Sequence, residues 1–395
     1  MKKILHIILL LGPLSIYAQR FDVTFPFDGV TREFIVVKPT GAVPAGGYPV
    51  VFMFHGTSGT GEQFYNTSKW KERGEIEKFI TVFPTALEYC VLNWQTNNPA
   101  RSTRWNNGTL IEDKCPNVAQ TFKDDVKFIR KMVDTIKQTF TVNPKKIFGS
   151  GFSNGGAMVA KLAMDAPDIF AAVANVGSMM HELDSLKPAK TIPIWSMVGS
   201  LDDRFTTAIG LPEIPFGGDS CLGYMQRGIN RFLVCESLTQ VYTKNNTPLT
   251  NSFLFTNRLV ITNTNRYIFT LVKGLIHQYP NGDNFPLVAA DLHWEFFKQS
   301  VSTDVKDIRL PESAVSLYPN PSHDAITVEM LENKTNTEGG VVQFSIFNTL
   351  GQQVFLRQQA PNTSFVVYKK DIGEGLFIVK IKQGNAIATK RLVFE

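Results

Sequence analysis

The sequence predicts an α/β fold: a mostly parallel sheet with helices on both faces, followed by a small all-β C-terminal sandwich. Two observations predict this order. Short apolar runs of strand length alternate with helical patterns up to about residue 300. Beyond residue 315, helical spacing gives way to short alternating runs separated by turn residues. A chain of 395 residues that is 43% hydrophobic can build two such cores.

The N-terminus reads as a secretory signal peptide over residues 1–18. Lys2 and Lys3 precede an apolar stretch that is too short to span a bilayer, and Pro13 interrupts that stretch. Ala18 is a small residue before a plausible cleavage point. We therefore expect a secreted protein. No later stretch predicts a membrane span, and charge is nearly balanced without a basic stripe, so we expect no nucleic-acid partner.

The first half of the α/β region begins with a loosely alternating stretch at residues 21–38, which predicts an edge hairpin. Residues 48–55, YPVVFMFH, form a continuous apolar run typical of a strand buried on both faces. The glycine-rich residues 55–61 follow, and such a loop exposes backbone N–H groups. The next elements predicted are a strand at 80–84, a loop at 89–116 and an amphipathic helix at 122–140.

The second half continues the alternation. Buried strands are predicted at residues 170–176, 192–198 and 266–273, and a closing amphipathic helix at 287–299. Residues 204–265 have weak periodicity, and a structureless loop of that length is improbable. We interpret them as an insertion folded over the active face, with a lid as one form that it could take.

Residues 146–156, KIFGSGFSNGG, contain the pattern Gly-x-Ser-x-Gly, with Ser153 between Gly151 and Gly155. A short apolar run precedes this pattern and a helix-forming stretch follows it. The pattern therefore predicts a sharp strand-to-helix turn that exposes the serine hydroxyl. The glycines are needed because strand and helix approach too closely for a β-carbon. We predict that Ser153 is a nucleophile.

A serine nucleophile needs a base, and the base needs a carboxylate that orients it. His277 follows the final predicted strand, where the chain order Ser, acid, His requires the base. The remaining histidines are assigned to the signal peptide (His6), the glycine-rich loop (His55), a weak rival position after a strand (His181), a packed helix (His293) and the C-terminal sandwich (His323).

Asp202 is the preferred acid because it follows a buried strand directly. The adjacent Asp203 is the alternative acid. If Asp203 is not catalytic, we expect it to be a solvated loop carboxylate or a helix cap. The expected oxyanion hole consists of the backbone N–H of Asn154, next to the nucleophile, and that of Thr57 in the glycine-rich loop.

Several motifs together resemble the secreted polyhydroxybutyrate depolymerase and feruloyl esterase family of α/β-hydrolases. They are FHGTSG, VNPKKIFGSGFSNGGAM, GSLDDRF and HQYPNG followed by WEFF, and the resemblance covers about residues 25–300. It implies a Ser/Asp/His esterase without a cofactor, acting on feruloyl or acetyl groups of plant polysaccharides or on short polyesters. The chain departs from the family at Leu275 and Ile276, where glycines are frequent, and at Tyr279, where a tryptophan is frequent. These departures concern the shape of the substrate pocket.

The substrate expected first is a feruloyl or acetyl-xylan ester, because Trp94, Trp105 and Tyr279 could frame an aromatic or sugar-bearing ester near the triad. The same aromatic residues could equally be core. A polyhydroxybutyrate or other polyester is the alternative substrate. A second alternative is a surface polysaccharide-binding protein that retains the fold without turnover.

The C-terminal segment, with LYPNPSHDAITV, FNTLGQQVF and a terminal KRLVFE, resembles the sorting domain of the type IX secretion system over residues 315–395. The resemblance implies export by the type IX secretion machinery and possible attachment to the cell surface. The charged and polar residues 301–314 are a plausible linker after an esterase domain at residues 19–300.

The four cysteines, Cys90, Cys115, Cys221 and Cys235, are candidates for two disulfides in an exported protein. Three connectivities are possible, and we prefer the local pairs Cys90 with Cys115 and Cys221 with Cys235. No C-x-x-C or His/Cys cluster suggests a metal site.

Overall fold

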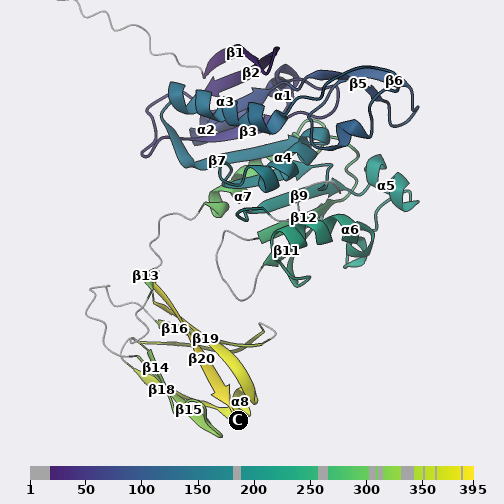
Figure 1. The fold of residues 1–395 in the computed structure, drawn as a ribbon. Helices are drawn as coiled ribbons and strands as arrows, with labels where there is room; N and C mark the ends of the chain where they lie inside the picture. Colours follow the sequence, from purple (N-terminus) through teal and green to yellow (C-terminus); the bar gives the residue numbers. More distant parts are fainter. Residues whose placement is uncertain are drawn as a thin grey trace, which may run out of the picture. The chain divides into compact units, whose positions relative to one another are not determined.

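A computed structural model describes residues 18–180, 188–256, 266–301, 308–309, 315–330, 342–349, 352–360, 363–383 and 386–395. The chain divides into two compact units, Met1–Val301 and Ser302–Glu395 (Figure 1). The expected signal peptide, apart from Ala18, and most of the expected linker lie outside the described residues. No helix within the described ranges is long and apolar enough to cross a membrane.

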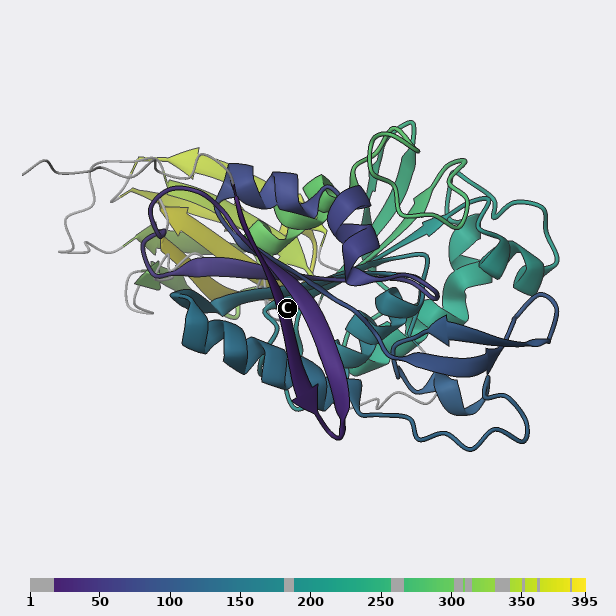
Figure 2. The same cartoon turned by 90° about the horizontal axis from the view of Figure 1, so that it is seen from above.

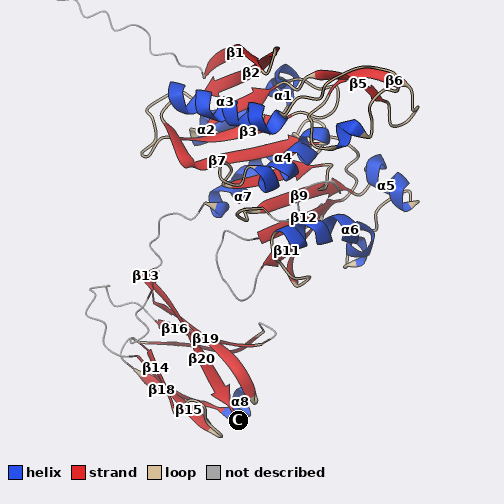
Figure 3. Ribbon diagram, in the orientation of Figure 1, coloured by secondary structure: helices blue, strands red, loops and turns tan. Residues whose placement is uncertain are grey.

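The first unit is built on a ten-stranded sheet (Figures 1 and 3). From edge to edge its strands are β1 (Gln19–Phe27), β2 (Val30–Lys38), β4 (Ile80–Pro84), β3 (Tyr48–Phe54), β7 (Val142–Phe152), β8 (Ala172–Val176), β9 (Ile194–Gly199), β12 (Arg266–Val272), β11 (Thr250–Thr256) and β10 (Tyr242–Asn246). The six strands from β4 to β12 in this order run parallel, and both pairs of edge strands are antiparallel. The mostly parallel sheet predicted from the apolar runs is therefore confirmed.

Helices cover both faces of this sheet, as Figure 2 shows from above. On one face α3 (Asp125–Thr139), α4 (Asn154–Asp165) and α6 (Ser220–Cys235) bury apolar side chains in a common core. On the other face α1 (Gly61–Thr67), α2 (Trp70–Glu77) and α7 (Ala289–Ser300) do the same. The sheet is thus shielded from water on both faces, which is why its central strands are almost continuously apolar.

Residues 204–265, expected to be an insertion over the active face, are described up to residue 256, and part of this segment extends the sheet instead. It begins with α5 (Asp203–Ile209) and continues with α6 and the strands β10 and β11. These strands extend the sheet beyond β12, because Phe253 and Phe255, two residues apart on β11, are both buried in the core beside α6. Alternate residues of a strand face the same side, so this two-residue spacing is the local signal for a strand. The periodicity averaged over the whole segment hides it.

The predicted loop at residues 89–116 was also wrong in part. It holds a two-stranded hairpin, β5 (Glu88–Leu92) and β6 (Pro99–Thr103), followed by a 3₁₀ turn at Thr109–Ile111. A disulfide joins Cys90 on β5 to Cys115, whose Cα atoms are 5.5 Å apart.

The predicted bond between Cys221 and Cys235 is absent. Both residues lie on the single helix α6, near its opposite ends. A rise of about 1.5 Å per residue separates them by roughly 20 Å, far beyond disulfide reach. Both are buried instead.

The described residues of the second unit form strands and one short helix. A five-stranded sheet is ordered β13 (Ile308–Arg309), β20 (Ala386–Phe394), β19 (Gly375–Gln383), β16 (Val342–Asn348) and β17 (Gln353–Gln359). A three-stranded sheet is ordered β14 (Val315–Tyr318), β15 (Ala325–Met330) and β18 (Ser364–Tyr368), and α8 (Lys369–Ile372) follows β18. Buried residues of both sheets form one core, so the predicted small sandwich is confirmed.

Candidate active site

The turn between β7 and α4 presents Ser153 in a strained conformation, with φ 51° and ψ −120°. A positive φ is costly for a residue with a side chain, and such strain is characteristic of functional sites. The flanking glycines make the turn possible. A β-carbon on Gly151 would lie 2.2 Å from the carbonyl oxygen of Gly155, and one on Gly155 would lie 2.3 Å from that of Phe54.

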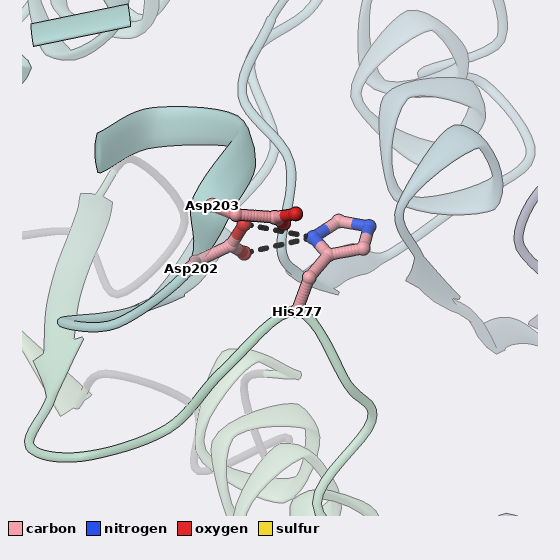
Figure 4. A group of neighbouring side chains, drawn as sticks. All are labelled: Asp202, Asp203 and His277. Atoms are coloured by element: carbon pink, nitrogen blue, oxygen red, sulfur yellow. Dashed lines mark hydrogen bonds and ion pairs between the residues drawn. The ribbon is translucent and has the colours of Figure 1, made fainter. Parts of the chain in front are cut away.

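The structure brings Ser153, His277 and Asp202 into one series of hydrogen-bond distances. The Oγ of Ser153 lies 2.8 Å from Nε2 of His277, and the Nδ1 of His277 lies 2.9 Å from each carboxylate oxygen of Asp202. Asp202 follows β9 and His277 lies in the loop after β12, so neighbouring parallel strands deliver both side chains to the same edge of the sheet. Figure 4 shows the imidazole pointing its Nδ1 at Asp202.

The two adjacent acids have different surroundings. The side chain of Asp202 is 1% exposed, and its Oδ1 also accepts the backbone N–H of Arg204 at 3.0 Å, so Asp202 caps α5. The side chain of Asp203 is 53% exposed. The donor atoms of Asp202, Asp203 and His277 lie within 4.8 Å of one another, a set that could hold a cation (Figure 4). Two of the three are already hydrogen-bonded to each other.

The two backbone amides of the oxyanion prediction belong to elements beside the turn that carries Ser153. Asn154 is the first residue of α4, and Thr57 is exposed in the loop after β3. The next residue, Ser58, has φ 62° and donates its N–H to the carbonyl oxygen of Thr103 at 2.9 Å. Within the described ranges, neither the Asn154 nor the Thr57 amide donates to an acceptor. Both remain free to bind a ligand oxygen.

His55 holds the glycine-rich loop in place. Its Nε2 accepts the N–H of Ala86 at 3.0 Å, so the ring proton is on Nδ1, which donates to the carbonyl oxygen of Gly56 at 2.7 Å. Burial lowers the pKa of His55 to about 4. His293 on α7 is also buried, with Nδ1 3.0 Å from the Oγ of Ser150, and burial lowers its pKa to about 3. The rival position His181 lies outside the described residues.

The three aromatic residues predicted to bind substrate lie in different environments. Trp105 is fully buried, and its Nε1 donates to the carbonyl oxygen of His55 at 3.0 Å. Tyr279 is 7% exposed, and its hydroxyl accepts the Nε1–H of Trp70 at 2.9 Å. Both side chains are packed in the core, which is the alternative that the sequence left open for them. Trp94 is 46% exposed between β5 and β6.

Two neighbours of the triad were missed by the sequence reasoning. The ring of Phe152 lies 5.0 Å from that of His277, centroid to centroid. The guanidinium of Arg204 lies over the indole of Trp94, 3.6 Å from its centroid. The available signal was proximity in sequence, because Phe152 precedes Ser153 and Arg204 follows the acids.

Comparisons with known protein families match both units. Residues 42–210 match the family model described as Phospholipase/Carboxylesterase. The first unit has the α/β-hydrolase fold. Residues 316–395, most of the second unit, match the model described as Secretion system C-terminal sorting domain.

Individual relatives are more distant. The chain is 38% identical over 79 residues to a "Putative esterase NocK" of Nocardia uniformis subsp. tsuyamanensis, which is 20% of this chain and 23% of that protein. It is 24% identical to "Feruloyl esterase B" of Piromyces equi, over 47% of this chain and 32% of the relative. It is 26% identical to "Poly(3-hydroxyalkanoate) depolymerase C" of Paucimonas lemoignei, over 43% of this chain and 37% of the relative.

Among solved structures, an acetyl xylan esterase from Aspergillus awamori superposes with a TM-score of 0.48 at 14% identity, over 71% of this chain and 99% of that chain. The matches to the three curated relatives span between about a quarter and two fifths of those proteins' lengths.

Proposed function

We propose that this protein is a secreted serine carboxylic ester hydrolase. The observation that carries the proposal is the unbroken series of hydrogen-bond distances from Ser153 through His277 to the buried carboxylate of Asp202. The match of residues 42–210 to carboxylesterases supports the same reaction class.

In the proposed mechanism Nε2 of His277 takes the proton of Ser153 while the serine oxygen bonds to the ester carbonyl carbon. The carbonyl oxygen becomes an oxyanion, which the amides of Asn154 and Thr57 stabilise. Asp202 holds Nδ1–H and stabilises the imidazolium. The imidazolium then gives its proton to the departing alcohol, which leaves an acyl-enzyme. A water molecule, deprotonated by the same nitrogen, hydrolyses the acyl-enzyme and restores Ser153.

The substrate that we favour is a feruloyl or acetyl-xylan ester of plant polysaccharide. The likeness to "Feruloyl esterase B" supports this choice. The likeness to "Poly(3-hydroxyalkanoate) depolymerase C" supports a polyester as the second candidate. Comparing methyl ferulate with a hydroxybutyrate oligomer under identical conditions separates the two candidates.

We further propose that residues 1–18 direct the chain across the inner membrane and that the sorting domain recruits the type IX secretion machinery. The family match at residues 316–395 supports the second step. Deleting residues 316–395 in the producing cell should retain the enzyme inside it; normal export of the shortened chain would contradict this role.

Replacing Ser153 with alanine tests the reaction. The purified variant should lose at least about 10³-fold in the kcat for p-nitrophenyl acetate, because the nucleophile is removed. The matched control Ser220→Ala, at the exposed start of α6, should keep wild-type activity. Full activity of Ser153→Ala would refute the mechanism. Failure of a fluorophosphonate probe to label the wild type, together with retained polysaccharide binding, would favour a non-catalytic binding protein.

A further inference from the structure

Trp94 and Arg204 meet although 110 residues separate them. Trp94 lies in the connection between β5 and β6, and Arg204 is the second residue of α5. The guanidinium carbon of Arg204 is 3.6 Å from the centroid of the Trp94 indole, which is direct cation–π contact. In Figure 1 the hairpin and α5 both lie at the right, beyond the ends of the strands of the large sheet.

Each partner belongs to an element that is fixed to a different part of the triad. On the α5 side, the Arg204 backbone N–H donates to Oδ1 of Asp202 at 3.0 Å. On the hairpin side, the carbonyl oxygen of Thr103 on β6 accepts the Ser58 N–H at 2.9 Å. Just past β6, the Trp105 N–H donates to Oδ1 of Asn154, beside the nucleophile, at 2.7 Å. The stack therefore joins the acid side of the site to its oxyanion side.

The guanidinium of Arg204 stacks on Trp94 but leaves its N–H groups without a close acceptor in the described part of the chain. Its Nε lies 4.0 Å from the nearest carboxylate oxygen, that of Asp203, and within the described ranges the guanidinium makes no hydrogen bond. The other arginines of this region are engaged. Arg104 contacts Asp113 at 2.6 Å, and Arg101 contacts Glu88 at 2.5 Å. Arg204 thus presents a planar set of N–H donors, with its flat face held by an indole.

We propose that Trp94 and Arg204 form a subsite for a carboxylate carried by the ester substrate at a distance from the scissile bond; this inference rests on the proposed function. A guanidinium binds a carboxylate through two parallel hydrogen bonds. The indole of Trp94 is 46% exposed, so part of its surface is open to a ring of the substrate. The substrate class is therefore an ester with an anionic ring-bearing group, on either its acyl or its alcohol part.

Two matched pairs of substrates test the subsite. For the alcohol part, 4-acetoxybenzoate is compared with the neutral 4-acetoxybenzamide. For the acyl part, monoethyl terephthalate is compared with the neutral ethyl 4-carbamoylbenzoate. The readout is the ratio of kcat/KM for the anionic substrate to that for the neutral one, because intrinsic reactivity cancels when the ratio is compared between variants.

Arg204→Gln should lower this ratio by about tenfold or more in at least one pair, since a charge-assisted bidentate contact is lost. Arg204→Lys should recover part of it, and Trp94→Ala should lower it by releasing the guanidinium. The matched control Arg101→Gln removes a charge from the same hairpin and should leave the ratio unchanged. An unchanged ratio for Arg204→Gln in both pairs would overturn the subsite while leaving esterase activity established.

A purely structural stack predicts a different result. If the contact only ties the hairpin to α5, Arg204→Gln and Trp94→Ala should lower the melting temperature. They should then change kcat/KM by the same factor for both substrates of a pair. A calorimetric titration with 4-hydroxybenzoate needs no turnover, so it decides the question even if the protein proves inactive. Weaker binding in Arg204→Gln than in Arg101→Gln supports the subsite, and equal affinities refute it.

Discussion

Asp202 contacts Nδ1 of His277 through both carboxylate oxygens, at 2.9 Å each, whereas the adjacent Asp203 has no hydrogen bond to the imidazole. Burial sharpens this difference, because the side chain of Asp202 is 1% exposed and that of Asp203 is 53% exposed. A buried carboxylate acts through a low local dielectric and keeps one orientation. Two neighbouring acids in the sequence are therefore not equivalent.

Asp202→Asn should reduce kcat by about 10⁴-fold, because an amide favours the wrong imidazole tautomer. Asp203→Asn is the matched control and should reduce kcat by less than about tenfold, since water screens its exposed charge. Steady-state kinetics on p-nitrophenyl acetate would measure both. A larger loss for Asp203→Asn than for Asp202→Asn would show that the acid is assigned to the wrong residue.

Tyr279 lies two residues after His277, and its hydroxyl accepts the Nε1–H of Trp70, so we expect it to position the loop that carries the base. Tyr279→Phe leaves that buried donor unpaired, at a cost of about 1–3 kcal/mol, and loosens the loop that carries the base. We expect a lower kcat with little change in KM, measured alongside the melting temperature. The control Tyr65→Phe removes a phenol from the partly buried Tyr65, which packs beside Phe83. A changed KM with an unchanged kcat would point instead to a substrate contact.

The disulfide content gives a third prediction. Denatured, unreduced protein should contain two thiols that react with Ellman's reagent, because Cys90 and Cys115 are joined and the α6 cysteines are not. The double substitution Cys90→Ser and Cys115→Ser should destabilise the hairpin region by about 3 kcal/mol, as expected for a closed loop of this length. Replacing Cys221 and Cys235 with alanine should leave the sensitivity to reductant intact. A count of zero thiols would establish the second disulfide.

Glu236 should make the first unit less stable in alkali. Burial raises the pKa of Glu236 from 4.5 to about 9, and the backbone of Ile192 opposes this rise. Between these values the unfolded chain has released the proton and the folded chain keeps it, so stability falls as pH rises, by about 1.4 kcal/mol per pH unit. Glu236→Gln should flatten the slope between pH 6 and 9, whereas Glu33→Gln, at an exposed position, should not. Equal slopes in both variants would contradict the burial of a protonated carboxyl.

Much of the site could be predicted because its chemistry follows local rules. A Gly-x-Ser-x-Gly turn has few possible geometries, and residues after parallel strands meet at one edge of the sheet, which places Ser153, Asp202 and His277 together. The burial of Trp105 and Tyr279 could not be predicted, since it depends on hydrogen bonds to His55 and Trp70, which are distant in sequence. The predicted disulfide between Cys221 and Cys235 was wrong because the spacing of the cysteines does not reveal that one helix carries both.

Two buried histidines should make the first unit sensitive to acid. Burial lowers the pKa of His55 to about 4 and that of His293 to about 3, from 6.5. As pH falls below 6.5, both histidines bind protons in the unfolded chain but stay neutral in the folded chain. Stability is therefore lost toward pH 4, by about 1.4 kcal/mol per pH unit for each histidine.

Urea unfolding followed by tryptophan fluorescence measures this loss for the first unit, because all five tryptophans lie before residue 302. His293→Gln should reduce the slope between pH 6.5 and 4 by about half, even if the variant is less stable at every pH. His323→Gln, exposed in the second unit, should leave the slope unchanged. If His293→Gln kept the wild-type slope, the folded protein would have to bind a proton on that buried ring. The coupling of burial to acid lability would then rest on His55 alone.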